Sequence, residues 1–238
     1  ADAGELPFSA QETAEAVERW RKDGFPPLHH SEIFRRNYAP AYRVLRRDFA
    51  RGLPLFARID RLTAERSRVL VAIEGGSASG KTTLGELLQN VYGCPVFHMD
   101  DFFLRPEQRT EARFTQPGGN VDRERFLEEV LIPLREGRPV DYRRFDCATF
   151  TIAPPQRIKA GTLNIVEGAY SMHPDLALYY DLSVFLPISA EKQRERILKR
   201  NAPAHAKQFF DRWIPFEQRY FDALDVRNRC DLILSADD

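Results

Sequence analysis

The chain has 238 residues, of which 43% are hydrophobic and 29% are charged, and this globular composition excludes wholesale disorder. Lysine plus arginine and aspartate plus glutamate both number 35, so the net charge is zero, which argues against a protein that binds mainly nucleic acid. No apolar run exceeds five residues, which argues against a membrane-spanning helix.

The first residues and the cysteines indicate a cellular compartment. Residues 1–10 have neither the basic nor the apolar region of a secretory signal. Cys94, Cys147 and Cys230 are few, odd in number and widely spaced, and they lack the spacing of a zinc site. We therefore expect free thiols and a cytoplasmic protein.

Residues 1–67 are predicted to form a helical extension. Ser9 can cap a helix that runs to about Lys22. Pro40 at a first helical position and Gly52 just beyond a last one predict a second helix. A third helix is expected from three apolar residues at helical spacing, Leu55, Ile59 and Leu62.

The segment from Ser31 to Arg68 is basic, with ten arginines and four acidic residues. Arginines on the solvent faces of amphipathic helices explain this pattern better than a nucleic-acid patch with interleaved aromatics. The sequence leaves the role of the extension open.

After Arg68 the pattern alternates short apolar strands with helices. Five strands are predicted, at 69–73, 95–99, 163–166, 182–186 and 232–234. Helices are predicted between them, at 82–90, 122–135 and 191–200, the last capped by Ser189. Because these strands lack polar alternation, we expect a parallel sheet covered on both faces.

The segment between the first strand and the next helix fits the pattern G-x-x-x-x-G-K-[ST]. Small residues let successive backbone N–H groups turn toward phosphate oxygens, and the following helix directs its positive end at the anion. Lys81 is expected to reach the β- and γ-phosphates, and the Thr82 hydroxyl to reach Mg²⁺. The predicted ATP-binding residues are Gly75, Gly76, Ser77, Ala78, Ser79, Gly80, Lys81, Thr82 and Thr83.

Two further strands end in acidic residues. Asp100 and Asp101 follow the second strand, and Glu167 follows the third. In open α/β sheets ligands bind beyond the carboxyl ends of the strands, so Asp100 and Glu167 are expected to face the phosphate loop. A Mg·ATP site needs such carboxylates to orient the metal and the acceptor hydroxyl. Asp101 fits a turn or capping role equally well.

Residues 191–212 carry seven lysines and arginines and three acidic residues. A mobile lid that brings arginines onto phosphates has this composition, because the planar guanidinium matches phosphate oxygens. Arg196 and Arg200 are the candidates, with a solvated helix face as the alternative.

Six segments, in this order and spacing, resemble the uridine kinase-like branch of the P-loop kinases, beside phosphoribulokinase and bacterial pantothenate kinase. They are GGSASGKTT (75–83), HMDDFF (98–103), QPGGNVDRERF (116–126), PVDYRRFDCAT (139–149), NIVEGAY (164–170) and YYDLSVFLPIS (179–189), and ERILKRN (195–201) follows. The resemblance implies an α/β P-loop NTPase fold with a parallel sheet of about five strands. The kinase domain would span 68–238, with an Arg-rich lid at about 200–212, after the helical extension 1–67.

The resemblance also implies roles for single residues. Asp100 would orient the acceptor hydroxyl, take its proton and lie at the metal, which Thr82 and Glu167 would hold. Lys81, Arg196 and Arg200 would stabilise the transferring phosphoryl group.

An acceptor pocket is implied in the same way. Phe103 would lie near a nucleoside sugar and base, Asn120 and Asp122 in a loop over the acceptor, and Tyr142 and Asp146 in the wall of its pocket. Two departures put the nucleobase in doubt: Phe103 and Asp101 replace a usual tyrosine and serine, and 139–149 contains no histidine.

The expected function is transfer of the γ-phosphate of Mg·ATP to a small-molecule hydroxyl, foremost the ribose 5′-hydroxyl of a nucleoside such as uridine. Pantothenate, nicotinamide riboside and a sugar or other polyol remain as acceptors. A nucleotide-hydrolysing regulator and a kinase of nucleic-acid ends are the alternatives from other classes. The sequence leaves the oligomeric state open, a homo-oligomer included.

Overall fold

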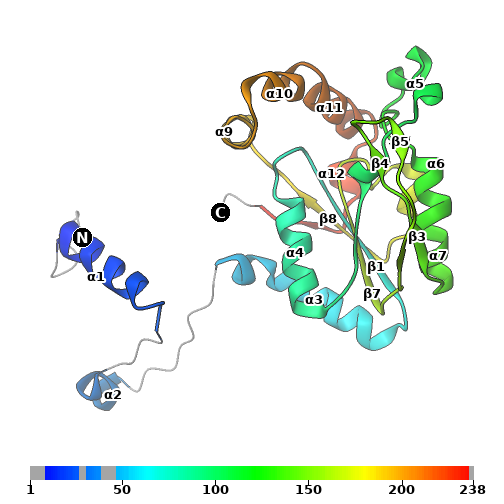
Figure 1. Cartoon of the computed structure of the whole chain (residues 1–238). Helices are drawn as coiled ribbons and strands as arrows, with labels where there is room; N and C mark the ends of the chain where they lie inside the picture. The colour runs from blue at the N-terminus through cyan, green and yellow to red at the C-terminus, as the bar shows by residue number, and fades with distance from the viewer. Residues whose placement is uncertain (1–8, 27–30, 39–46, 236–238) are drawn as a thin grey trace. The chain divides into compact units, whose positions relative to one another are not determined.

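The computed structural model describes residues 9–26, 31–38 and 47–235 (Figure 1). The chain divides into two units, Ala1–Leu45 and Arg46–Asp238. The first contains helices α1 (Ala10–Lys22) and α2 (Glu32–Tyr38). Ser9 caps α1 through a reciprocal pair of hydrogen bonds with Glu12, as the sequence predicted.

The second unit begins with a single helix where two were predicted. Helix α3 (Arg47–Glu65) runs without a break through Gly52 and Pro54, and Pro40 lies outside the described residues. Leu55 and Ile59 of this helix are fully buried, and their burial offsets the cost of a proline inside a helix. Helix α3 therefore belongs to the second compact unit.

The centre of the second unit is a parallel five-stranded sheet in the order β2-β7-β1-β8-β9. Each strand matches a predicted one: β1 (Val69–Gly75), β2 (Val96–His98), β7 (Leu163–Glu167), β8 (Leu182–Leu186) and β9 (Leu232–Ile233). The central strand β1 pairs in register from Val69 with Leu163 to Ile73 with Glu167. This register brings the ends of β1 and β7 to the same edge of the sheet, and the α/β fold is confirmed.

Each face of the sheet has its own apolar core. Leu55, Ile59 and Leu88 lie in one core, against the face covered by α3 and α4 (Lys81–Tyr92). Phe97 and Phe126 lie in the other. Figure 1 shows α3 and α4 on one side of the sheet and α6 (Arg123–Phe126) and α7 (Ile132–Glu136) on the other.

The remaining elements lie beyond the sheet. The predicted helices near 122–135 and 191–200 are confirmed as α6, a π-helical turn (Leu127–Leu131) and α7, and as α9 (Ala190–Arg200), which Ser189 caps. The predicted lid segment is helical and continues as α10 (Pro203–Gln208), a π-helical turn (Phe209–Trp213) and α11 (Ile214–Ala223). Short helices α5 (Glu111–Thr115), α8 (Pro174–Ala177) and α12 (Val226–Arg229) complete the set.

Two short antiparallel ribbons were not predicted. One pairs β3 (Val140–Tyr142) with β6 (Gln156–Ile158), and the other pairs β4 (Phe145–Asp146) with β5 (Thr151–Ile152). Strands this short carry too little alternation to be recognised from sequence. Within the described parts of the chain, no helix has the length and apolar character needed to cross a membrane.

Candidate active site

The loop from Gly75 to Thr82 joins β1 to α4 in a conformation that depends on its small residues. Gly75, Ala78 and Gly80 all have positive φ, which glycine adopts without strain. A side chain on Gly75 would come within 2.6 Å of the Leu186 carbonyl oxygen. The loop is therefore closed tightly against the end of β8, with its N–H groups at the start of α4.

Two polar side chains of the loop are buried. Lys81 is 8% exposed, and its Nζ donates to the Gly76 carbonyl oxygen over 2.9 Å. Ser79 is 1% exposed, and its hydroxyl has no hydrogen-bond partner. Because a buried hydroxyl without a partner is costly, the loop suits a ligand that carries acceptor oxygens, as a phosphate does.

Glu167 lies at the end of β7 beside the phosphate loop. Its Oε1 accepts a 3.1 Å hydrogen bond from the Thr82 hydroxyl and lies 2.6 Å from His98 Nδ1. Burial opposes the charged carboxylate, but the His98 hydrogen bond and the charge of Lys81 outweigh it and lower the pKa of Glu167. The same hydrogen bond raises the pKa of His98.

Asp100 lies in a 3-10 turn (Met99–Asp101) directly after β2. Its carboxylate opens to the cavity yet is surrounded by protein atoms that displace water, which raises its pKa. The positive charge of Lys81 opposes this shift, and the negative charges of Glu167 and Asp101 add to it. The four groups therefore interact electrostatically, and Asp100 is shifted toward the range in which a carboxylate serves as a base.

One cavity of about 720 Å³ contains these groups. Its lining includes Ser77 to Thr83 of the loop, Asp100 and Glu167, together with Arg196 and Arg200 of α9. The structure thus brings together residues that the sequence placed at five separate points. The volume is within the range of small-molecule sites.

The cavity also has walls that the sequence did not indicate. They come from α3, α4, the end of β7, the residues after β9, the π-helical turn after α10, and α11, and include Arg51, Gly52, Asn90, Ala169, Leu234, Ser235, Phe209 and Glu217. These residues are too far apart in sequence to form a motif that could be recognised from the sequence alone.

The two lid arginines occupy different positions. Arg196 Nη1 donates to the Ala78 carbonyl oxygen over 3.0 Å, so it contacts the phosphate loop itself. The Arg200 guanidinium lies 5.8 Å from the centre of the Phe209 ring, at the cavity wall. Arg196 therefore braces the loop, and Arg200 lies where it can meet a bound phosphate.

The fit of a magnesium ion is decided by the oxygen donors. Mg²⁺ uses oxygen ligands, typically one or two carboxylates together with substrate phosphates. Thr82 Oγ1 and Glu167 Oε1 supply such oxygens side by side. Because only two protein oxygens are offered here, they fit a metal that also takes oxygens from substrate phosphates. In the part of the chain that the structure describes, no group of three or more His, Cys, Asp or Glu could hold a metal ion.

Two of the predicted acceptor residues lie near the short pairing of two separate segments, Phe103 soon after β2 and Asn120 just before α6. Phe103 is half-buried, pairs with Val121 in an isolated β-bridge and has its ring 6.1 Å from that of Trp213. Asn120 is buried, beside Tyr170. Contact of either residue with an acceptor stays a prediction.

The other three have structural partners. Asp122 caps α6 by accepting from the Arg125 N–H, and Asp146 accepts from the Ala148 N–H in the turn of a ribbon. The buried Tyr142 donates to Asp101 over 2.7 Å and accepts from the His98 N–H over 3.0 Å. None of the five predicted acceptor residues, Phe103 and Asn120 included, lines the cavity. Asp101 has the turn-stabilising partner that the sequence left open.

Buried carboxylates beside the loop were missed at the level of sequence. Glu74 is fully buried and accepts from Tyr220 of α11, and Glu217 of α11 is 6% exposed and accepts from Ser77. Glu74 could have been found from the sequence, because it is an acidic residue in the otherwise apolar strand β1. Glu217 has no such signal, because it lies among other charged residues on a helix.

Comparison with known proteins identifies the family and the type of fold. The model of the phosphoribulokinase / uridine kinase family matches residues 70–205, more than half of the chain. Uridine kinase-like protein 4 of Arabidopsis thaliana is 24% identical over 184 residues, 71% of this chain and 39% of that protein. The uridine kinase of Chloroflexus aurantiacus is 29% identical over 143 residues, 56% of this chain and 68% of that protein.

A third relative has a different acceptor in its name. The bifunctional alpha-galactosidase/sucrose kinase of Mediterraneibacter gnavus is 29% identical over 195 residues, 72% of this chain and 20% of that protein. The chain thus spans about two fifths of the plant relative and a fifth of this bacterial one.

Solved structures agree on the fold. A putative fructose transport system kinase from Silicibacter sp. superposes with a TM-score of 0.61 at 24% identity, over 77% of this chain and 98% of that one. A possible uridine kinase from Bacillus stearothermophilus superposes with a TM-score of 0.56 at 20% identity, over 76% and 99%. The expected P-loop fold, the expected family and the expected kinase class are confirmed.

Proposed function

We propose that this chain, which belongs to the phosphoribulokinase / uridine kinase family, transfers the γ-phosphate of Mg·ATP to the ribose 5′-hydroxyl of a nucleoside such as uridine. The observation that carries the proposal is that Lys81, Thr82, Asp100 and Glu167 line one cavity. A phosphoryl transfer needs a phosphate cradle, a metal-orienting carboxylate and a group that holds the acceptor hydroxyl. The residues proposed for these three roles lie at one edge of the sheet.

The nucleotide end of the cavity is formed by the loop and α9. The loop N–H groups and Lys81 would hold the phosphates, and Arg200 would approach them from α9. Thr82 and Glu167 would hold Mg²⁺, which when bound neutralises charge on the phosphate oxygens. Charge stabilisation by preorganised groups of this kind supplies most of the rate in phosphoryl transfer.

The acceptor end is formed around Asp100. In a loose transition state little proton transfer is needed early, so Asp100 would chiefly orient the acceptor hydroxyl and take its proton late. The raised pKa of Asp100, which burial causes first, favours this late acceptance. Closure of the 200–212 segment would exclude water, which is a competing acceptor.

A sugar is the second candidate acceptor. The sucrose kinase relative matches 72% of this chain, about as much as the 71% matched by uridine kinase-like protein 4, so a relative with a sugar acceptor in its name matches as extensively as a uridine kinase-like one. In addition, Tyr142 of the segment 139–149 uses its hydroxyl on Asp101 and His98, so that segment lacks both a histidine and a free tyrosine hydroxyl for a nucleobase. These observations support a pocket that reads hydroxyl groups.

The deciding experiment measures ADP release from ATP against a panel of nucleosides, sugars, pantothenate and nicotinamide riboside, with Lys81→Ala as the inactive control. Release that depends on a nucleoside supports the first candidate, and dependence on a sugar alone replaces it with the second. ADP release without any acceptor would support a nucleotide-hydrolysing regulator. Oligonucleotide binding that falls steeply with salt would support a nucleic-acid kinase.

A further inference from the structure

Ser77, the third residue of the phosphate loop, is held by a carboxylate from α11. The Ser77 N–H donates to Glu217 Oε2 over 2.9 Å, and the Ser77 hydroxyl donates to Glu217 Oε1 over 2.6 Å. Glu217 is 140 residues away in sequence and only 6% exposed. Both carboxylate oxygens therefore bind one loop residue, in a place where water competes little.

A single peptide group connects the contact between Glu217 and Ser77 to Lys81. The Ser77 N–H and the Gly76 carbonyl belong to the same planar peptide. Glu217 accepts a hydrogen bond from the N–H of this peptide, and Lys81 Nζ donates to the carbonyl oxygen of the same peptide over 2.9 Å. A rotation of this peptide would break both hydrogen bonds, so Glu217 and Lys81 fix its orientation together.

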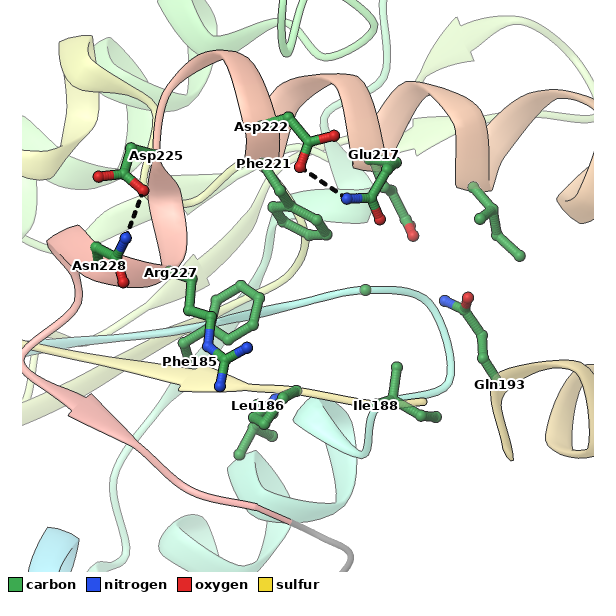
Figure 2. A pocket seen from close by; sticks show the side chains of 14 residues that line it. Phe185, Leu186, Ile188, Gln193, Glu217, Phe221, Asp222, Asp225, Arg227 and Asn228 are labelled. Atoms are coloured by element: carbon green, nitrogen blue, oxygen red, sulfur yellow. Dashed lines mark hydrogen bonds between the residues drawn. The ribbon is translucent and has the colours of Figure 1, made fainter. Parts of the chain in front are cut away.

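Helix α9 holds the same stretch of loop as well. Gln193 Nε2 donates to the Ser77 carbonyl oxygen over 2.9 Å, and Arg196 donates to that of Ala78 over 3.0 Å. Figure 2 shows Gln193 and Glu217, from α9 and α11, at the wall of a second cavity of about 470 Å³. A Cβ on Gly76 would lie 3.0 Å from Gln193 and 3.4 Å from Glu217, so the loop is closely enclosed.

Helix α11 is itself anchored to the strand that precedes the loop. One helical turn after Glu217, the Tyr220 hydroxyl donates to Glu74 Oε2 over 3.0 Å. The Met172 N–H donates to the same oxygen, also over 3.0 Å. Glu74 and Tyr220 are both fully buried, so α11 is fixed at the end of β1 and its carboxylate reaches Ser77 from a rigid base.

We propose that Glu217 is a positioning residue for phosphoryl transfer, which holds the Gly76–Ser77 peptide so that Lys81 and the loop N–H groups keep the geometry that ATP requires. The inference rests on the proposed function for its kinetic consequences, but ATP binding alone tests it as well. With this role for Glu217, α11 is part of the nucleotide-binding site, although it follows the lid segment in sequence.

Two conservative substitutions distinguish a positioning role of Glu217 from a role of its negative charge. Glu217→Gln keeps the length of the side chain, accepts from the Ser77 N–H with its carbonyl oxygen and donates to the Ser77 hydroxyl with its amide. Glu217→Asp keeps the charge but is one methylene shorter and cannot reach both groups. A positioning role predicts that Glu217→Gln keeps activity and Glu217→Asp loses it. A proton-transfer role or a role of the charge predicts the reverse.

The experiment measures kcat and KM for ATP at saturating acceptor, and the dissociation constant for ATP by calorimetry without acceptor. We expect Glu217→Asp and Glu217→Ala to lose roughly 10- to 100-fold in kcat/KM for ATP, since small misplacements of a reacting group have effects of this size. Glu217→Gln is expected to stay within about threefold of the wild type, because its hydrogen bonds persist, and to leave the pH–rate profile unchanged. Gln218→Ala, an exposed neighbour on α11, is the matched control.

Each outcome decides the inference. Loss in Glu217→Gln equal to that in Glu217→Asp, a shifted pH–rate profile in the Gln variant, or full activity of Glu217→Ala would each overturn it. If Glu217→Ala does not fold, the Gln and Asp variants carry the comparison. If the wild type binds ATP but phosphorylates no acceptor, the proposed function fails while the ATP affinities of the same variants still decide the role of Glu217.

Discussion

The Thr82 hydroxyl donates a 3.1 Å hydrogen bond to Glu167 Oε1, which joins the first turn of α4 to the end of β7. These two residues are 85 positions apart in sequence. The register of β7 on β1 places Glu167 opposite Ile73, next to the start of the loop. The proximity of this proposed metal-binding pair is therefore a consequence of strand pairing, and each group can be tested separately.

Glu167→Gln is expected to raise the Mg²⁺ concentration needed for half-maximal rate by roughly 10- to 100-fold, as changes around metal ligands commonly do. The amide keeps the volume but removes the charge that a magnesium ion prefers. Rates measured over a titration of free Mg²⁺ check this. Glu136→Gln, at the exposed last residue of α7, serves as control, and an unchanged Mg²⁺ requirement in Glu167→Gln would remove Glu167 from the metal site.

Asp100→Asn is expected to lower kcat by about 10²- to 10⁴-fold, the usual contribution of an acid–base group, while ATP binding persists. The amide can still contact a hydroxyl but cannot take its proton. Asp101→Asn is the neighbouring comparison, because Asp101 is engaged by Tyr142, and it is expected to affect folding stability more than kcat. Near-full activity of Asp100→Asn on the true acceptor would show that the assignment of Asp100 is wrong.

Arg200→Ala is expected to lower kcat by roughly 10³-fold, within the range known for arginines that stabilise the transferring phosphoryl group. Its guanidinium lies against Phe209 at the cavity wall, with no loop carbonyl as partner among the described contacts. Arg194→Ala, which removes a guanidinium stacked on Phe210 of the same region, is the matched control. Steady-state kinetics of both variants check the prediction, and equal effects would indicate a general packing role.

Glu74→Gln is expected to flatten the pH dependence of the free energy of unfolding. Burial raises the pKa of Glu74 from 4.5 to about 7, so the folded protein holds a proton that the unfolded chain releases between these values. The stability from this group is complete below about pH 4.5 and is lost as the pH rises through about 7, by up to about 3 kcal/mol.

Urea unfolding at a series of pH values between 4.5 and 8 measures this slope. Gln also places an amide donor among the N–H and O–H donors that surround Glu74, so absolute stability is expected to fall at every pH. The slope is therefore the deciding quantity, and a slope as steep as that of the wild type would contradict the raised pKa.

Much of the second unit was predictable from the chain alone. Apolar strands such as Val69–Ile73, the Gly-rich loop up to Thr82 and the cap at Ser189 depend on residues close together in sequence, because their hydrogen bonds and dihedral preferences are local. The resemblance to a kinase family rested on the same local segments. Placement of Asp100 and Glu167 near the loop followed from the rule that parallel strands end at one edge.

Local signals failed where packing outweighed them. Gly52 and Pro54 indicate a helix end, yet α3 continues through both because Leu55 and Ile59 are buried on the sheet. The Tyr142 hydroxyl donates to Asp101, 41 positions away, a contact that no local pattern indicated.

By itself, the sequence determined the order in which the sheet strands and their connecting helices follow one another along the chain. It also determined the phosphate loop and the kinase class of chemistry, since each of these features is encoded within a few neighbouring residues. Only the tertiary structure decided which side chains support that loop. The contacts of Glu217 with Ser77 and of Glu74 with Tyr220 join residues 140 and 146 positions apart, and they exist because α11 packs against the end of β1. Such contacts depend on the position of a whole helix, which no local pattern of residues specifies.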